Sequence, residues 1–170
     1  MKRFIFASIV MCILAGCDTS QTVNNDTVDS FNLTKYMGEW YEIARFDHWF
    51  ERGMQQNKAL YTLREDGKVD VTNSGIKNGK EVTVKGIAKT TDSPGLLRVS
   101  FFGPFYADYR ILYIDAAYQY ALVGSDSDDY LWMLAREPQL EESDRDILLY
   151  EAIKRGYDIS KILWIEDITK

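Results

Sequence analysis

The sequence predicts an all-β fold, in which eight antiparallel strands form an up-and-down β-barrel and a C-terminal α-helix packs on its outside. Three observations predict it. Between Gly38 and Arg136, short runs rich in β-branched and aromatic residues are separated by turn residues at intervals of about 8–12. Apolar and polar residues alternate within several of these runs. Beyond residue 140 the apolar residues take the spacing of a helix.

The turns between the predicted strands contain residue pairs that are typical of tight turns. Asp66-Gly67 and Asn78-Gly79 suit tight hairpins, because both pairs tolerate left-handed backbone conformations. Pro94-Gly95 and Gly103-Pro104 mark the next two turns. The predicted strands are 39–46, 57–64, 68–74, 80–89, 96–102, 107–114, 119–124 and 130–136. Hairpin-linked strands with one apolar face favour a closed barrel over an open sheet, because closure removes the exposed edges.

A single amphipathic helix follows the predicted strands. Ser143 and Asp146 have the spacing of a capping box, and Gly156 is a typical stop. One apolar stripe is expected between them, formed by Ile147, Leu148, Leu149, Ala152 and Ile153. Residues 162–165 predict a short extra strand.

The N-terminus has the features of an export signal. Lys2 and Arg3 precede an apolar run over 4–14, which is too short to span a bilayer. Leu14-Ala15-Gly16-Cys17 resembles the lipobox of bacterial lipoproteins, which implies that residues 1–16 are a signal peptide and that Cys17 is lipidated. The alternative is an ordinary thiol at Cys17. Polar residues follow, so 17–30 is expected to be the lipidated Cys and a flexible tether to a domain at 31–170.

The cell envelope is the expected location, but the sequence does not decide between its two membranes. Asp18 after the lipidated Cys is an inner-membrane retention signal in some bacteria. The family resemblance described below favours the outer membrane, and the inner membrane stays open as the alternative.

Composition and charge exclude several classes of function. The 170 residues are 46% hydrophobic, which indicates one folded domain with a core. A net charge of −6 without a Lys and Arg cluster argues against nucleic acid as a partner. His48 is the sole histidine, no Gly-x-Ser-x-Gly is present, and the acidic run 126–129 lacks the Gly of a calcium loop. We therefore expect neither an enzyme nor a metal or other cofactor.

Three segments resemble the conserved regions of the lipocalin family. They are Gly38-Glu39-Trp40-Tyr41, Asp115-Ala116-Ala117-Tyr118, and Arg136 at the end of the last predicted barrel strand. The second departs from the family pattern, because Ile114 stands before Asp115 where the family has Thr. The resemblance covers about residues 31–168 and implies that Arg136 stacks on Trp40 at a closed barrel end, with Gly38 beside them as a structural residue.

The resemblance also implies a ligand in the barrel, of the class of fatty acids or lysophospholipids. Several expected inward side chains are small, so an apolar pocket can form. The alternative is a filled interior in an anchored module that binds another protein. The expected pocket residues are Glu42, Ala59, Tyr61, Val71, Val84, Val99, Phe101, Leu112, Trp132 and Leu134.

Two features near the pocket leave alternatives open. Glu42 is expected to point inward, either as a polar anchor for the ligand or paired with Arg136 or another basic group. The connection 47–56 carries Trp49, Phe50 and Met54, which either border the barrel mouth and gate it or pack within the loop. The sequence leaves the oligomeric state, including a homodimer, open.

Overall fold

The structure is a computed structural model that describes residues 23–49 and 51–165. The expected signal peptide, Cys17 and the side chain of Phe50 therefore lie outside the described residues. The described elements are α1 (Leu33–Tyr36), β1 (Gly38–Phe46), β2 (Met54–Leu63), β3 (Val69–Lys77), β4 (Lys80–Thr90), β5 (Leu96–Phe102), β6 (Phe105–Ile114), β7 (Tyr120–Gly124), β8 (Leu131–Ala135), α2 (Glu142–Lys154), the 3-10 helix η1 (Ile159–Lys161) and β9 (Ile162–Trp164).

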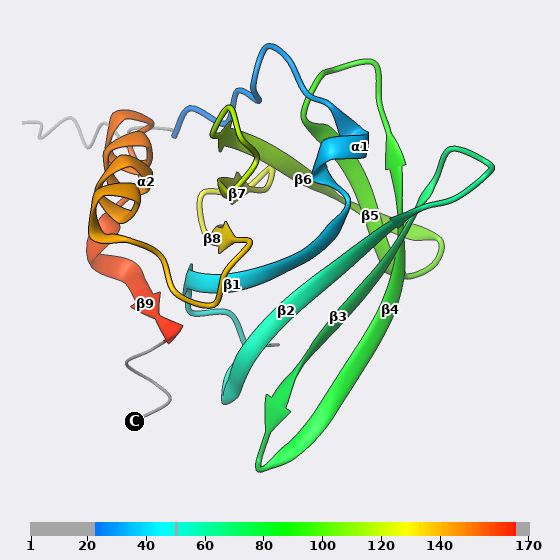
Figure 1. The fold of residues 1–170 in the computed structure, drawn as a ribbon, viewed down its shortest axis with the longest axis horizontal. Helices are drawn as coiled ribbons and strands as arrows, with labels where there is room; N and C mark the ends of the chain where they lie inside the picture. The colour runs from blue at the N-terminus through cyan, green and yellow to red at the C-terminus, as the bar shows by residue number, and fades with distance from the viewer. Residues whose placement is uncertain (1–22, 50, 166–170) are drawn as a thin grey trace, which may run out of the picture.

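Strands β1 to β8 form a closed antiparallel barrel, as the sequence predicts (Figure 1). Neighbouring strands pair in chain order from β2 to β8, and β1 closes the barrel between β8 and β2. Asn78 and Gly79 take the left-handed conformations expected of the Asn-Gly turn, with φ of 52° and 72°. The expected extra strand is β9, which pairs with β1 at Ala44 and Trp164.

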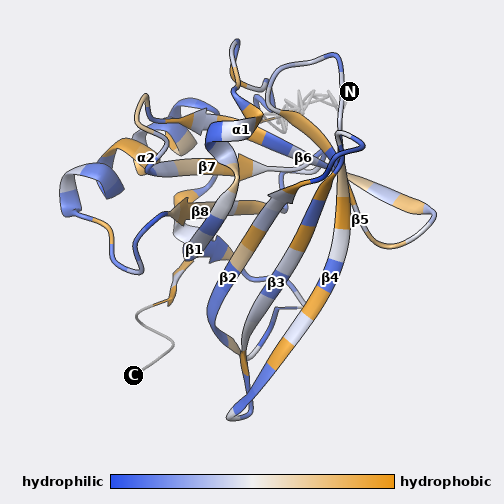
Figure 2. Cartoon of the chain, turned by 45° about the vertical axis from the view of Figure 1, so that its right-hand side comes forward, coloured by the Kyte–Doolittle hydropathy of each residue, from blue (hydrophilic) through white to orange (hydrophobic). Residues whose placement is uncertain are grey.

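Hydrophobic and hydrophilic residues alternate along several strands (Figure 2). The buried apolar residues form two clusters. The inner cluster fills the closed half of the barrel, where Trp40 and Tyr36 are fully buried. The outer cluster lies between the barrel and α2, where Leu148 and Ala152 meet residues of β1, β7 and β8 such as Leu122. Among the described residues, no helix is long and apolar enough to span a bilayer.

Leu112 is not a pocket residue, contrary to the expectation. Tyr109 and Ile111 belong to the inner cluster, so alternation along β6 places Leu112 on the outer face, and the register shift with β7 changes faces only beyond it. Leu112 packs in the outer cluster, where Gly124 makes room for it: a Cβ at Gly124 would lie 2.9 Å from Leu112 Cδ1.

Helix α2 differs from its prediction in two ways. It begins at Glu142 with Glu141 as its N-cap and no side-chain cap, so the expected capping box of Ser143 and Asp146 is wrong. The expected single stripe is divided between two faces. Leu148 and Ala152 are buried, whereas Ile147 and Ile153 are exposed. Residues one position apart lie about 100° apart around a helix, so these neighbours cannot all face the barrel.

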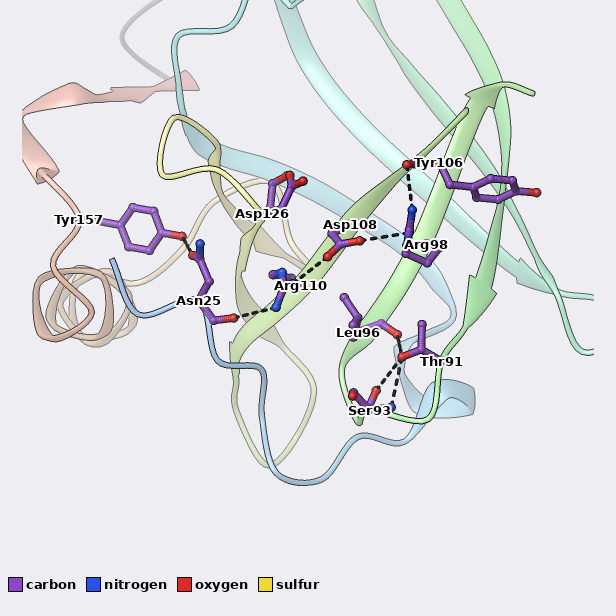
Figure 3. Close-up of polar contacts among 11 residues, drawn as sticks. Asn25, Thr91, Ser93, Leu96, Arg98, Tyr106, Asp108, Arg110, Asp126 and Tyr157 are labelled. Atoms are coloured by element: carbon purple, nitrogen blue, oxygen red, sulfur yellow. Dashed lines mark hydrogen bonds and ion pairs between the residues drawn. The ribbon is translucent and has the colours of Figure 1, made fainter. Parts of the chain in front are cut away.

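The segment before α1 is held against the barrel rather than loose. Asn24 N donates to Arg155 O at 2.8 Å, and Val28 N donates to Ile111 O at 3.0 Å. The Asn25 side chain accepts from Tyr157 Oη at 2.6 Å, and its carbonyl accepts from Arg110 (Figure 3). The expectation of a flexible tether through residue 30 therefore fails from Val23 onward.

Candidate ligand-binding site

The inward face of the barrel runs from a sealed base to a region that solvent reaches. Strand register places Trp40, Ala59, Asn73 and Val84 side by side across β1 to β4. Trp40 is fully buried, whereas Val84 at the other end of this row is 38% exposed. Solvent therefore reaches part of the inward face at Val84.

Most of the expected pocket residues lie in the inner cluster. Its members from that set are Ala59, Tyr61, Val71, Val99, Phe101, Trp132 and Leu134. Gly86 on β4 lets the ring of Phe101 lie close to the sheet, because a Cβ at Gly86 would be 2.7 Å from Phe101 Cδ1. Val84 shares the inward face, Glu42 is buried, and Leu112 is the exception described above.

The base of the barrel is closed by Arg136, as the family resemblance implies. Its guanidinium carbon lies 3.9 Å from the centre of the Trp40 ring. It also donates to the backbone carbonyls of Glu39, at 2.7 Å, and Met37, at 2.9 Å. Gly38, with φ of 98°, lies so close that a Cβ there would be 3.2 Å from an Arg136 nitrogen. These residues are structural and lie away from the solvent-reached part of the interior.

Three tyrosines form a hydrogen-bonded group above this base, which the sequence reading missed. Tyr109 Oη lies 2.7 Å from Tyr36 Oη and 2.8 Å from Tyr61 Oη. Burial raises the pKa of all three hydroxyls, to about 12 for Tyr61. Because the hydroxyls satisfy one another, the group limits the depth of the interior without leaving a polar atom unpaired. Apolar and polar residues do not alternate simply in the sequence of β6, which contains Tyr109. No sequence pattern therefore indicates that the three tyrosines meet.

A buried polar group forms the second part of the site. The pairing of β1 with β8 shifts register between Glu42 and Ala44, opposite Leu134 and Met133. After this shift both Glu42 and Arg45 are buried and form an ion pair. Asn57 Nδ2 donates to the Glu42 carboxylate at 3.3 Å. Glu42 therefore pairs with a basic group, but with Arg45 rather than Arg136, and its role as a ligand anchor stays a prediction.

Glu51 brings a second carboxylate to the same guanidinium. Its Oε2 lies 3.8 Å from Arg45 Nε and accepts from Trp132 Nε1 at 3.2 Å. Burial, together with the charge of Glu42, raises the pKa of Glu51 to about 7. Burial also raises the pKa of Glu42, although Arg45 offsets part of that rise. Two carboxylates therefore share one guanidinium, and their titrations are linked.

His48 lies beside this polar group. Its ring centre is 4.9 Å from that of Trp132 and 4.8 Å from that of Tyr130. Burial and the nearby Arg45 lower the pKa of His48 to about 4. The imidazole is therefore neutral at physiological pH and acts as a packed aromatic ring.

The polar group reaches the surface where β1 and β2 separate. These strands pair from Gly38 and Tyr61 to Tyr41 and Lys58, and β1 then continues beside β9. A groove of about 460 Å³ opens at this seam. Its lining includes Tyr41, Glu42, Ile43, Gln56, Asn57, Lys58, Pro138, Gln139, Arg145 and Ile165. Polar ligand atoms can thus approach Glu42 and Asn57 from outside the barrel.

The connection between β1 and β2 closes over this region. Arg45 donates to the Glu51 carbonyl at 3.1 Å, so the loop is fastened to the barrel. Trp49 is 77% exposed, and Met54 is the half-buried first residue of β2. Whether this loop gates the barrel mouth stays a prediction. The sequence reading missed an exposed aromatic pair, Phe102 and Phe105, which pair across the β5–β6 turn.

Comparisons with known proteins agree with this architecture. The family model of the lipocalin-like domain matches residues 31–167. The outer membrane lipoprotein Blc of Escherichia coli K12 is 38% identical, covering 95% of this chain and 94% of that protein. Temperature-induced lipocalin-1 of Arabidopsis thaliana is 39% identical, covering 81% of this chain and 80% of that protein.

A solved structure extends the likeness to the fold. Insecticyanin from the tobacco hornworm Manduca sexta superposes with a TM-score of 0.70 at 20% identity and covers 84% of each chain. The barrel, its Trp40–Arg136 base and the matches over most of the chain lead to one conclusion: the chain belongs to the lipocalin family.

Proposed function

We propose that this chain is a lipid-anchored lipocalin of the cell envelope that binds fatty acids or lysophospholipids in its barrel and stores or transports them. The observation that carries the proposal is the gradient of exposure along the inward face, from buried Trp40 to Val84. This face offers apolar contacts to an acyl chain and lies open to solvent at one end.

The expected affinity follows from the length of acyl chain that the barrel buries. About ten methylenes contribute roughly 8 kcal/mol, and association costs about 4 kcal/mol or more. Micromolar binding is therefore expected, strong enough to carry a lipid and weak enough to release it. The group of Glu42, Arg45 and Asn57 supplies polar partners for the head of the ligand.

Export and acylation at Cys17 would place the protein at a membrane. The bacterial relatives from Escherichia coli and Vibrio cholerae are named outer membrane lipoproteins, which supports the outer membrane as the location. Asp18 is the feature that supports the inner membrane instead. The proposed role is binding rather than catalysis, because the polar residues brought together in the barrel are held in ion pairs and hydrogen bonds.

A second candidate function is an anchored module that binds another protein. The exposed Phe102 and Phe105 at the β5–β6 turn favour it, since exposed aromatic pairs are frequent contact points between proteins. In this alternative the barrel interior carries no lipid.

Native mass spectrometry of the full chain, purified from bacterial membranes, separates the two functions. Lipid carriage predicts a bound mass in the range of a fatty acid or lysophospholipid, identified after organic extraction. Protein without bound lipid, which also fails to take up added lysophospholipid, would contradict lipid carriage. If the Phe102→Ser and Phe105→Ser double variant binds as much lipid as the wild type, the aromatic pair is not needed for lipid binding.

A further inference from the structure

The outward face of α2 carries three large apolar side chains that the barrel does not cover. Ile147, Tyr150 and Ile153 are 37%, 63% and 54% exposed. They follow one another at intervals of three residues and so lie on one side of the helix, opposite Leu148 and Ala152. The other exposed positions on and beside this face are Glu142, Ser143, Asp146 and Lys154, which together carry a net charge of about −1.

This face lies beside the point where the N-terminal segment reaches the domain. Asn24 N donates to the carbonyl of Arg155, directly after α2, and the Arg155 guanidinium donates to Asp26 O at 2.8 Å. Val23 lies next to Gly156, where a Cβ would be 3.8 Å from Val23 Cα. The first described residues thus begin at the C-terminal end of α2 (Figure 1).

Chain length limits how far the proposed anchor can be from α2. Six residue steps separate Cys17 from Val23. A fully extended chain covers at most about 3.6 Å per residue, so Cys17 lies within roughly 20 Å of Val23 whatever path the chain takes. If Cys17 carries acyl chains in a bilayer, the C-terminal end of α2 is held near that bilayer. This step rests on the proposed acylation.

We propose that the outward face of α2 lies on the bilayer surface, with Ile147, Tyr150 and Ile153 in the interfacial region. A helix that lies along a membrane surface places the apolar side chains of its exposed side at the boundary of headgroups and acyl chains. Tyr places its ring there and its hydroxyl among the headgroups. Lys154 can extend its ammonium toward lipid phosphates. Because charge contributes little, the contact is expected to resist high salt.

The contact gives the anchored barrel a fixed orientation. Figures 1 and 2 place α2 and β5 on opposite sides of the barrel. With α2 on the bilayer, the aromatic pair Phe102 and Phe105 is directed away from it. The outward face of α2 would thus lie in the bilayer interface, whereas Phe102 and Phe105 would lie in water. This difference can be measured.

The test compares two labelled positions on the full chain. Tyr150→Cys and Phe105→Cys each receive an environment-sensitive fluorophore, and the protein is reconstituted in vesicles of phosphatidylethanolamine and phosphatidylglycerol that contain lipids with a quencher at the headgroup boundary. We expect several-fold stronger quenching at position 150 than at position 105, unchanged by high salt. An Ile147→Ser and Ile153→Ser double variant in the Tyr150→Cys background should lose most of that difference.

The outcomes separate this inference from the anchor itself. Acylation is read by mass spectrometry, and anchoring by flotation of the chain with vesicles. A chain without acyl groups at Cys17 overturns both the anchor and the helix contact. A chain that floats but shows equal or no quenching at the two positions overturns the helix contact alone. The helix contact is also overturned if the fluorophore at position 150 changes its environment only at high protein concentration, because a second copy of the chain then covers α2.

Discussion

At the scale of single residues, the polar group around Arg45 has the most distinctive chemistry in the barrel. Glu42 and Glu51 both face this guanidinium, while Trp132 and Asn57 supply further hydrogen bonds. A buried carboxylate normally loses its proton only when it has enough partners. Burial, together with the charge of Glu42, raises the pKa of Glu51 to about 7.

The titration of Glu51 makes stability depend on pH. Between its ordinary value of 4.5 and about 7, the unfolded chain ionises Glu51 while the folded chain keeps the proton. The folded state then binds more protons, so the contribution of Glu51 to stability falls as pH rises through this window. We expect Glu51→Gln to gain up to about 3 kcal/mol relative to wild type between about pH 5 and pH 8. Urea unfolding across this range measures the gain, and parallel pH profiles of the two proteins would contradict it.

Arg136 is the second residue with a sharp expectation. Its guanidinium stacks on Trp40 and donates to several backbone carbonyls at the barrel base. Arg136→Met keeps much of the packing but removes these donors, and we expect a loss of about 2–4 kcal/mol in the free energy of unfolding. Arg52→Met, on the exposed ion pair with Asp47, is the matched control and should cost less than about 1 kcal/mol. Equal losses in both variants would show that Arg136 has no special role.

At the scale of strands and helices, local sequence was enough to predict the barrel. The turn residues and the alternation predicted eight strands, because hairpins and pleats are local features. Register shifts could not be predicted from turn residues and alternation. One extra residue in β1 and one in β6 changes which face the following side chains take. For this reason Arg45 was missed as a site residue. Leu112 was assigned to the wrong face of a strand that alternates normally up to that residue.

Helix α2 shows the same limit. Ile147 and Leu148 look equivalent in the sequence, but in the structure one is exposed and the other is fully buried in the outer cluster. In detergent, without a bilayer, Leu148→Ala should cost about 2–5 kcal/mol of unfolding free energy, because it leaves a cavity. Ile147→Ala should change it by less than about 1 kcal/mol. Thermal and urea unfolding of the two variants measures the difference, and similar losses would mean that both residues are packed.

At the scale of the whole molecule, the barrel combines a sealed base, an inward face that solvent reaches, and a side seam. The family resemblance supplied the Trp40–Arg136 base. The seam and its polar group arise from long-range pairing, as β1 leaves β2 after Tyr41 and continues along β9. No local pattern encodes that change of partner, so it could not be predicted from the sequence.

Binding of a long-chain lysophospholipid to two neighbouring variants on β4 tests the proposed carrier function most directly. Val84 faces the barrel interior, whereas Thr83 beside it faces outward and is exposed. Val84→Trp puts an indole where the acyl chain would lie, and we expect calorimetry to show binding weakened about tenfold or more, equivalent to roughly 1.4 kcal/mol. Thr83→Trp should bind like wild type. Equal affinity in all three proteins would contradict lipid binding inside the barrel.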